Sequence, residues 1–276
     1  MSVRAGRRSP ARAPRGAGIR RRSAGMTPLR AGAILLMLLC AAGAYGVVGT
    51  GAFAFRHLKV DGEHYTPESA VTSVLALQQG TNLVRLRTDT LVESLRTIPT
   101  VRDAQVSIEL PDTVRVRIEE REPILIWAAG ENRFLVDRSG LLFARSGDEA
   151  AGAIADLRVI HDARTSAGAL FVGAVLDPID LDVATRLGSL KPADLASGAA
   201  ELTVTVDDTG GFVMTSGADS WVATFGIYTP TLRPPTIVPE QVRLLRSILV
   251  ERGEANVARI DLARTREGTY ELKNGR

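Results

Sequence analysis

Cysteine and histidine are scarce in this chain of 276 residues. It holds one cysteine, Cys40, and three histidines, His57, His64 and His161. A single cysteine excludes a disulfide within the chain, and the histidines do not stand at the spacing of a zinc site. We therefore expect a protein that is stabilised by its apolar core and that carries no metal and no cofactor.

Motifs of catalysis are scarce too, since the chain has no nucleophile elbow, no glycine-rich phosphate loop and no Ser-x-x-Lys sequence. The triplet Asp208-Thr209-Gly210 matches the aspartic-protease motif, which needs a second aspartate on a symmetric loop. Here Asp207 and Gly211 flank the triplet, as is typical of a hairpin turn. The sequence favours a binding protein without catalytic residues, and a protease is the weakest alternative.

Acidic residues are absent from the first 30 positions, which hold nine arginines. The whole chain has 34 Lys and Arg against 31 Asp and Glu, so the rest of the chain is net acidic. Glycine, serine, proline and alanine fill the gaps between the arginines, and such a segment cannot bury enough surface to fold. We expect residues 1–30 to form a disordered basic tail in the cytoplasm, with no role in nucleic-acid binding.

Charge of either sign is missing from residues 31–55, a run of 25 residues between Arg30 and Arg56. A helix needs about 20 mostly apolar residues to cross a bilayer. The run predicts one transmembrane helix, and the arginines before it predict a cytoplasmic N-terminus with the remaining chain outside. A signal peptide cleaved near Ala42-Gly43-Ala44 and a twin-arginine signal at residues 20–23 are the alternatives.

Residues 56–123 show a strand, two helices and a hairpin in that order. A short alternating strand ends at Asp61-Gly62. Thr66 predicts the N-cap of a helix that runs to Gly80, and residues 90–93 predict a capping box for a second helix that ends before residue 99. Apolar residues then alternate over 104–110 and over 114–119, on either side of the turn at Pro111.

This β-α-α-β-β order is that of a POTRA domain, and two motifs sharpen the likeness. The runs VRDAQV at 101–106 and LPDTVRVRIEEREP at 110–123 make the chain resemble the FtsQ/DivIB family of bacterial division proteins. The resemblance implies an α+β protein with a single N-terminal transmembrane helix at 31–55. It also implies a POTRA domain at 56–123 and a mixed, β-rich FtsQ-type domain with flanking helices at 124–276.

Residues 124–276 carry strand and helix signals that fit this implied β-domain. The run LVDRSGLLF at 135–143 predicts a hairpin and also resembles the family. Helical spacing is seen at 181–190 and 239–253, and alternating strands at 202–206, 212–214, 221–225, 258–262 and 268–272. The family commonly has a lysine before the last helix, where this chain has Gln241 beside the proline-rich segment 229–239.

The resemblance implies a bitopic scaffold of the division septum in the cytoplasmic (inner) membrane. Such a scaffold binds FtsB and FtsL, acts indirectly on FtsW and FtsI, and helps to recruit and regulate septal peptidoglycan synthesis. FtsB adds a strand at the end of the β-domain in that family. The alternative function is a membrane-anchored POTRA chaperone or export factor for secreted polypeptides.

A strand at the end of this domain can accept a partner strand through its unpaired backbone groups. Tyr270 is suited to anchor a partner, and basic residues before it are suited to meet acidic groups. Equally, Tyr270 and Leu272 could pack inward, because alternation buries one face of a strand. The candidate partner-binding residues are Arg264, Arg266, Gly268, Thr269, Tyr270 and Leu272.

Overall fold

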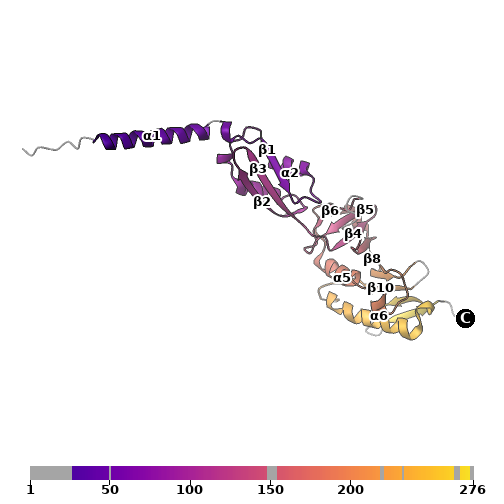
Figure 1. Ribbon diagram of the computed structural model, residues 1–276. Coiled ribbons are helices and arrows are strands. Elements are labelled where there is room, and N and C mark those ends of the chain that lie inside the picture. The colour runs from indigo at the N-terminus through magenta and orange to yellow at the C-terminus, as the bar shows by residue number, and fades with distance from the viewer. Residues whose placement is uncertain are drawn as a thin grey trace, which may run out of the picture. The chain divides into compact units, whose positions relative to one another are not determined.

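The computed structural model describes residues 27–49, 51–147, 154–217, 221–231, 233–263 and 268–273 (Figure 1). The chain divides into two compact units between Ala52 and Phe53. Most of the predicted basic tail, residues 1–26, lies outside the described residues.

The first unit contains helix α1, Pro28–Gly49, which is followed by the 3-10 turn η1, Gly51–Phe53. The uncharged run 31–55 is therefore not one continuous helix, and its helical part begins before the run and ends at Gly49. Within the described residues, no helix reaches the combination of length and apolarity that crossing a bilayer requires.

The second unit begins with a three-stranded sheet covered by two short helices, which confirms the predicted β-α-α-β-β order. The elements are β1 (His57–Asp61), α2 (Glu68–Leu75), η2 (Leu83–Arg85), α3 (Thr88–Leu95), β2 (Val101–Glu109) and β3 (Thr113–Glu120). β3 lies in the centre, parallel to β1 and antiparallel to β2. Alternate residues of β3 point to one face and form a core with the helices; the core includes Val71, Leu75, Leu91, Leu95, Val114, Val116 and Ile118.

Both predicted helix caps in this domain are wrong. Pro67 occupies the N-cap position of α2, and the hydroxyl of Thr66 bonds instead to the buried hydroxyl of Thr100 at 2.6 Å. α2 also ends early, at Ala76, which has a φ of 45°. The capping box at residues 90–93 does not form, because the hydroxyl of Thr90 donates to the carbonyl of Arg87. In both places the threonine hydroxyl bonds to another partner and does not accept a hydrogen bond from a helix amide.

The motif Glu120-Arg121 joins the POTRA sheet to the β-domain. The carboxylate of Glu120 accepts hydrogen bonds of 2.7–2.9 Å from the amides of residues 64–66. Arg121 donates through Nε to the carbonyl of Pro99 at 2.9 Å and through Nη1 to Asp137 Oδ2 at 2.6 Å. Asp137 follows the second strand of the β-domain, so one arginine holds both sides of the junction.

The rest of the second unit is built on a nine-stranded sheet of order β12-β11-β10-β9-β8-β7-β4-β5-β6. Three neighbouring pairs are parallel: β4 with β7, β7 with β8, and β10 with β11. The strands are β4 (Leu125–Ala129), β5 (Asn132–Val136), β6 (Leu142–Arg145), β7 (Val159–Asp162), β8 (Thr203–Asp207), β9 (Gly211–Thr215), β10 (Val222–Gly226), β11 (Val257–Asp261) and β12 (Thr269–Leu272).

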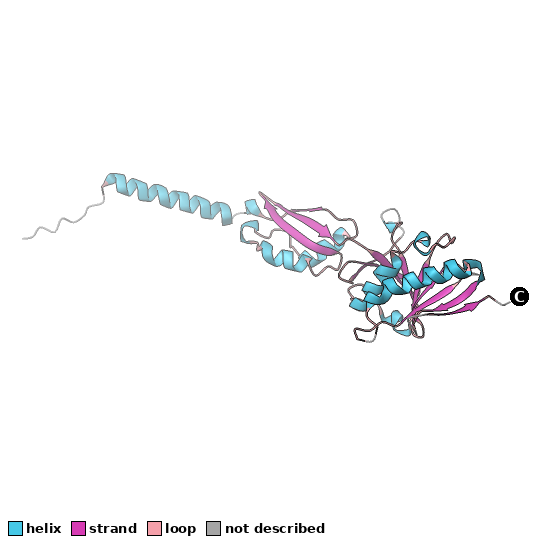
Figure 2. Cartoon of the chain, turned by 90° about the horizontal axis from the view of Figure 1, so that it is seen from below, coloured by secondary structure: helices cyan, strands magenta, loops and turns pink. Residues whose placement is uncertain are grey.

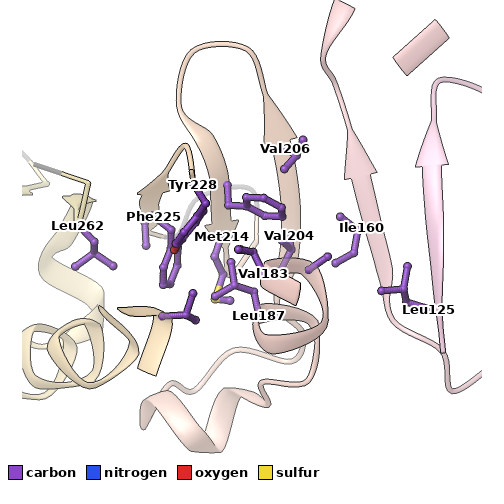
Figure 3. Close-up of a cluster of buried hydrophobic side chains, with 14 of the residues drawn as sticks. Leu125, Ile160, Val183, Leu187, Val204, Val206, Met214, Phe225, Tyr228 and Leu262 are labelled. Carbon is purple, nitrogen blue, oxygen red and sulfur yellow. The ribbon is translucent and has the colours of Figure 1, made fainter. Parts of the chain in front are cut away.

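Two helices cover one face of this sheet (Figure 2). α5 is Pro178–Gly188, with Asp177 as its N-cap, and α6 is Val238–Arg252. Val183 and Leu187 of α5 lie beside Met214 and Val204 of the sheet (Figure 3). The short 3-10 turns are η4 (Thr165–Ala169), η5 (Pro192–Leu195), η6 (Pro235–Ile237) and η7 (Glu254–Asn256).

Candidate partner-binding edge

β12 is the edge strand at one end of the nine-stranded sheet. It pairs antiparallel with β11, and in the described part of the chain no strand pairs with its other side. All four of its residues are exposed, with Tyr270 at 37% and Leu272 at 53%. Neither side chain is buried, although both stand opposite core residues of β11, Ile260 and Val257.

The ring of Tyr270 is held by the last residue of α6. The guanidinium of Arg252 lies 5.1 Å from the ring centroid, within the range of a cation–π interaction. Tyr270 also stands opposite Ile260 of β11, whose side chain belongs to the core. One side of the aromatic ring is thus supported, and 37% of the residue surface is open to solvent.

Gly268 allows the chain to enter β12. Its φ is 63°, in the left-handed region that glycine tolerates best. A Cβ at this position would lie 3.1 Å from Leu244 Cδ2 of α6 and 3.5 Å from Leu262 Cδ2. A larger residue would therefore be strained and crowded where the strand begins.

Arg264 and Arg266 lie outside the described residues, so the structure does not place them. The last described residue before them is Ala263, whose carbonyl accepts a hydrogen bond from Nη2 of Arg233. Arg233 and Ala263 line a pocket of about 460 Å³ at the ends of β10 and β11. The sequence did not predict a role for Arg233. Its only signal is an arginine inside the proline-rich segment.

Gln241 fixes α6 to the sheet behind this edge. Its Nε2 donates to the carbonyls of Phe225 and Leu262, at 2.9 and 3.0 Å. Its Oε1 accepts from the hydroxyl of Tyr228 at 2.6 Å, and burial raises the pKa of Tyr228. The residue that the sequence marked only as a departure from the family pattern lies in the first turn of α6 and ties it to β10 and to the residue that follows β11.

The opposite edge of the sheet, β6, is covered. The amide of Leu142 donates to the carbonyl of Ala174 at 2.9 Å, and the amide of Gly173 donates back to Leu142 at 2.8 Å. Phe143, the next residue of β6, is fully buried, and its ring meets that of Tyr65 at 5.8 Å. Only β12 therefore presents an open edge among the described strands of this sheet.

The protease-like triplet has a structural role. Asp207 Oδ1 accepts from the amides of Thr209 and Gly210, which forms the predicted turn between β8 and β9. Asp208 Oδ2 accepts from the amide and the hydroxyl of Thr165, and these bonds hold the pKa of Asp208 below its usual value. Among the residues that the structure describes, no cluster of three or more His, Cys, Asp or Glu could hold a metal.

Comparison with known proteins identifies the first domain of the second unit. Residues 53–121 match the family model described as a POTRA domain of FtsQ type. The chain is 27% identical over 176 residues to the cell division protein FtsQ of Mycobacteroides abscessus, which is 63% of this chain and 55% of the relative.

Two further FtsQ proteins are similar. The chain is 34% identical to that of Agrobacterium fabrum over 45% of this chain and 39% of the relative, and 32% identical to that of Mycolicibacterium smegmatis over 62% and 49%. The matched region thus covers about half the length of these curated relatives. The β-α-α-β-β domain with its Glu120-Arg121 motif thus matches the FtsQ-type POTRA family, and the chain is similar to these FtsQ cell division proteins over the matched regions.

Proposed function

We propose that this protein is a non-enzymatic scaffold of bacterial cell division that binds FtsB and FtsL through the open edge of its β-domain. By this binding it helps to recruit and regulate septal peptidoglycan synthesis, and it acts indirectly on FtsW and FtsI. The exposure of β12 at the end of the nine-stranded sheet is the observation that supports the proposal most strongly.

The proposed contact is β-augmentation, in which a partner strand pairs with the free backbone groups of β12. Main-chain hydrogen bonds then supply affinity, and side chains on alternate positions supply specificity. Tyr270 and Leu272 point to the same face of β12 and offer apolar surface, with the Tyr270 ring already held by Arg252. Arg264 and Arg266 remain proposed contacts for acidic residues of the partner.

The second part of the proposal concerns location. The uncharged run 31–55 and the arginine-rich residues before it support anchoring in the cytoplasmic membrane at the septum, with the N-terminus inside. This part rests on the sequence. Carbonate extraction and protease protection of the full chain test it, and a chain that is released from membranes by carbonate would contradict it.

The partner edge is tested by a matched pair of variants. Leu272→Glu places a charge on the open edge, and Val175→Glu places the same charge on an exposed residue beside the covered edge. We expect Leu272→Glu to weaken FtsB binding by about tenfold or more, as titration of purified proteins would measure. Val175→Glu should leave binding unchanged, and an equal loss in both variants would contradict the proposal.

A depletion experiment tests the function in cells. Cells depleted of the protein should form filaments and lose septal FtsB and FtsL, and the Leu272→Glu variant should not restore either. Normal division and normal septal signals after depletion would overturn the proposal. A photocrosslinker at position 270 distinguishes a scaffold from a chaperone. A scaffold should be crosslinked to a few fixed partners, and a chaperone should be crosslinked to many unfolded clients.

A further inference from the structure

We propose that the end of the POTRA domain at which the chain enters is a contact surface for anionic lipid headgroups. This inference deepens the anchoring part of the proposed function and rests on it. The surface, which we name the entry pole, consists of Arg56, Val84, Arg85, Arg87 and Leu110.

Backbone hydrogen bonds gather these residues around the first residues of the domain. The amide of Phe55 donates to the carbonyl of Thr81 at 2.8 Å, and Ala54 pairs with Asn82, two residues before Val84. On the other side, the amide of Arg56 donates to the carbonyl of Asp112 at 2.9 Å. The segments that carry residues 84–87 and Leu110 therefore flank the entering chain.

Two large apolar side chains of the entry pole face solvent. Val84 is 51% exposed in the turn η2, and Leu110 is 59% exposed in the loop between β2 and β3. They are the exposed large apolar residues of the POTRA domain as the structure describes it. Most other large apolar side chains of this domain pack on its core, so these two are available to a surface outside it.

Three arginines belong to the same segments of the chain. Arg56, Arg85 and Arg87 are exposed, and within the described residues none of them takes part in an ion pair. Most nearby acids are already engaged. His57 lies 3.8 Å from Asp112, and Glu109 meets Lys59 at 3.7 Å and Arg115 at 2.6 Å. The exposed Asp89 is the remaining acid near Arg87.

Free guanidinium groups around exposed valine and leucine match an anionic membrane surface. Arginine binds phosphate through paired N–H donors, and each basic residue near anionic lipid contributes about 1 kcal/mol at physiological salt. The uncharged run of the sequence ends at Phe55, directly before Arg56, so membrane anchoring would hold the entry pole close to the headgroups. An acidic protein is the other possible occupant, and the experiment separates the two.

The test measures the exposure of position 110 in the full chain. A Cys40→Ser, Leu110→Cys chain carries an environment-sensitive fluorophore and is reconstituted into nanodiscs of phosphatidylcholine, with or without one third phosphatidylglycerol. Cys40 is the single native cysteine, so the label has one site. A Thr97→Cys chain is the matched control, because Thr97 is exposed and precedes the start of β2, whereas Leu110 follows its end.

We expect iodide quenching at position 110 to fall about threefold when phosphatidylglycerol is present, with no change at position 97. Replacing Arg56, Arg85 and Arg87 by glutamine should restore the quenching. The same replacement of three exposed arginines elsewhere in the domain, Arg96, Arg102 and Arg117, should leave the protection at position 110 intact.

Two results would overturn the inference alone. One is equal quenching at positions 97 and 110 in both lipids while the chain remains in the discs. The other is protection of position 110 in neutral lipid after addition of purified FtsB or FtsL, which would assign the entry pole to a protein. Failure of the chain to enter the discs would instead overturn the anchoring proposal, and the inference with it.

Discussion

The two edges of the nine-stranded sheet differ, because one is covered by other parts of the chain and the other is open. β6 is bonded by the segment around Ala174, buried at Leu142 and Phe143, and in contact with Tyr65 of the POTRA domain. β12 has an uncovered edge and four exposed residues. An open edge can pair with another chain, and β12 is the edge to which the proposal assigns a partner. β12 is therefore the edge of this sheet that is available to a partner strand.

The largest expected effect is on the covered edge. Phe143→Ala removes a fully buried ring and should lower the free energy of unfolding by about 3–5 kcal/mol. Urea denaturation, followed by the fluorescence of the buried Trp127 and Trp221, measures it. The aromatic residue of the open edge gives the matched variant, Tyr270→Ala. A similar loss in both variants would contradict the difference between the edges.

The next effect concerns the support of the open edge. Gln241→Leu leaves the carbonyls of Phe225 and Leu262 without their buried donor and should cost about 2–3 kcal/mol. Gln105→Leu, at an exposed position of β2, is the control and should cost little. In a double-mutant cycle with Tyr228→Phe the two losses should not add, because the two side chains share one bond. Additive losses would show that Gln241 stabilises the fold through contacts other than its hydrogen bond with Tyr228.

A smaller effect is expected at the junction beside the covered edge. Burial alone would raise the pKa of Asp137. Hydrogen bonds from Ser139, Arg121 and two backbone amides outweigh burial and hold that pKa below its usual value of 3.8. The ionised carboxylate therefore stabilises the fold at pH values above about 4, and this contribution is lost as the pH falls through the lower folded-state pKa.

Asp137→Asn should therefore lower the free energy of unfolding by about 1 kcal/mol at neutral pH. Its deficit relative to the parent chain should shrink as the pH falls below about 4. The exposed Asp89 supplies the control Asp89→Asn. Urea melts at a series of pH values provide the measurement, and a deficit that does not change with pH would contradict the assigned cause.

The smallest effect on stability is expected at the open edge. Tyr270→Ala should change the free energy of unfolding by about 0.5 kcal/mol, because the ring keeps only the contact with Arg252 and neighbouring groups on β11 and α6. The same variant should weaken FtsB binding by about tenfold. A stable variant with unchanged binding would remove Tyr270 from the proposed interface.

The sequence predicted the POTRA order well because its signals were local. Residues 104–110 and 114–119 alternate in polarity, and both lie in the hairpin of β2 and β3. β4 was missed because all five of its residues are buried, so its sequence LIWAA shows no alternation. The cap at Thr66 failed because Thr100, 34 residues away, binds its hydroxyl.

The edge strand of the candidate site was predicted from its alternating sequence, and its binding role stays a proposal. The strand signal of residues 268–272 was correct, and the exposure of Tyr270 became known only from the structure. The roles of Gln241 and Arg252 could not be predicted, because each depends on how α6 packs against β10, β11 and β12. The arginines at 264 and 266 stay a prediction.

The Glu120-Arg121 pair has a consequence for substitution. The two carboxylate oxygens of Glu120 take hydrogen bonds from three successive amides, and a glutamine of the same shape would turn an NH2 group toward some of these donors. Lysine in place of Arg121 would lose the fork that reaches Pro99 and Asp137 at once. We therefore expect that even conservative replacements of these two residues weaken the junction between the POTRA domain and the β-domain. This expectation does not depend on which partner the protein binds.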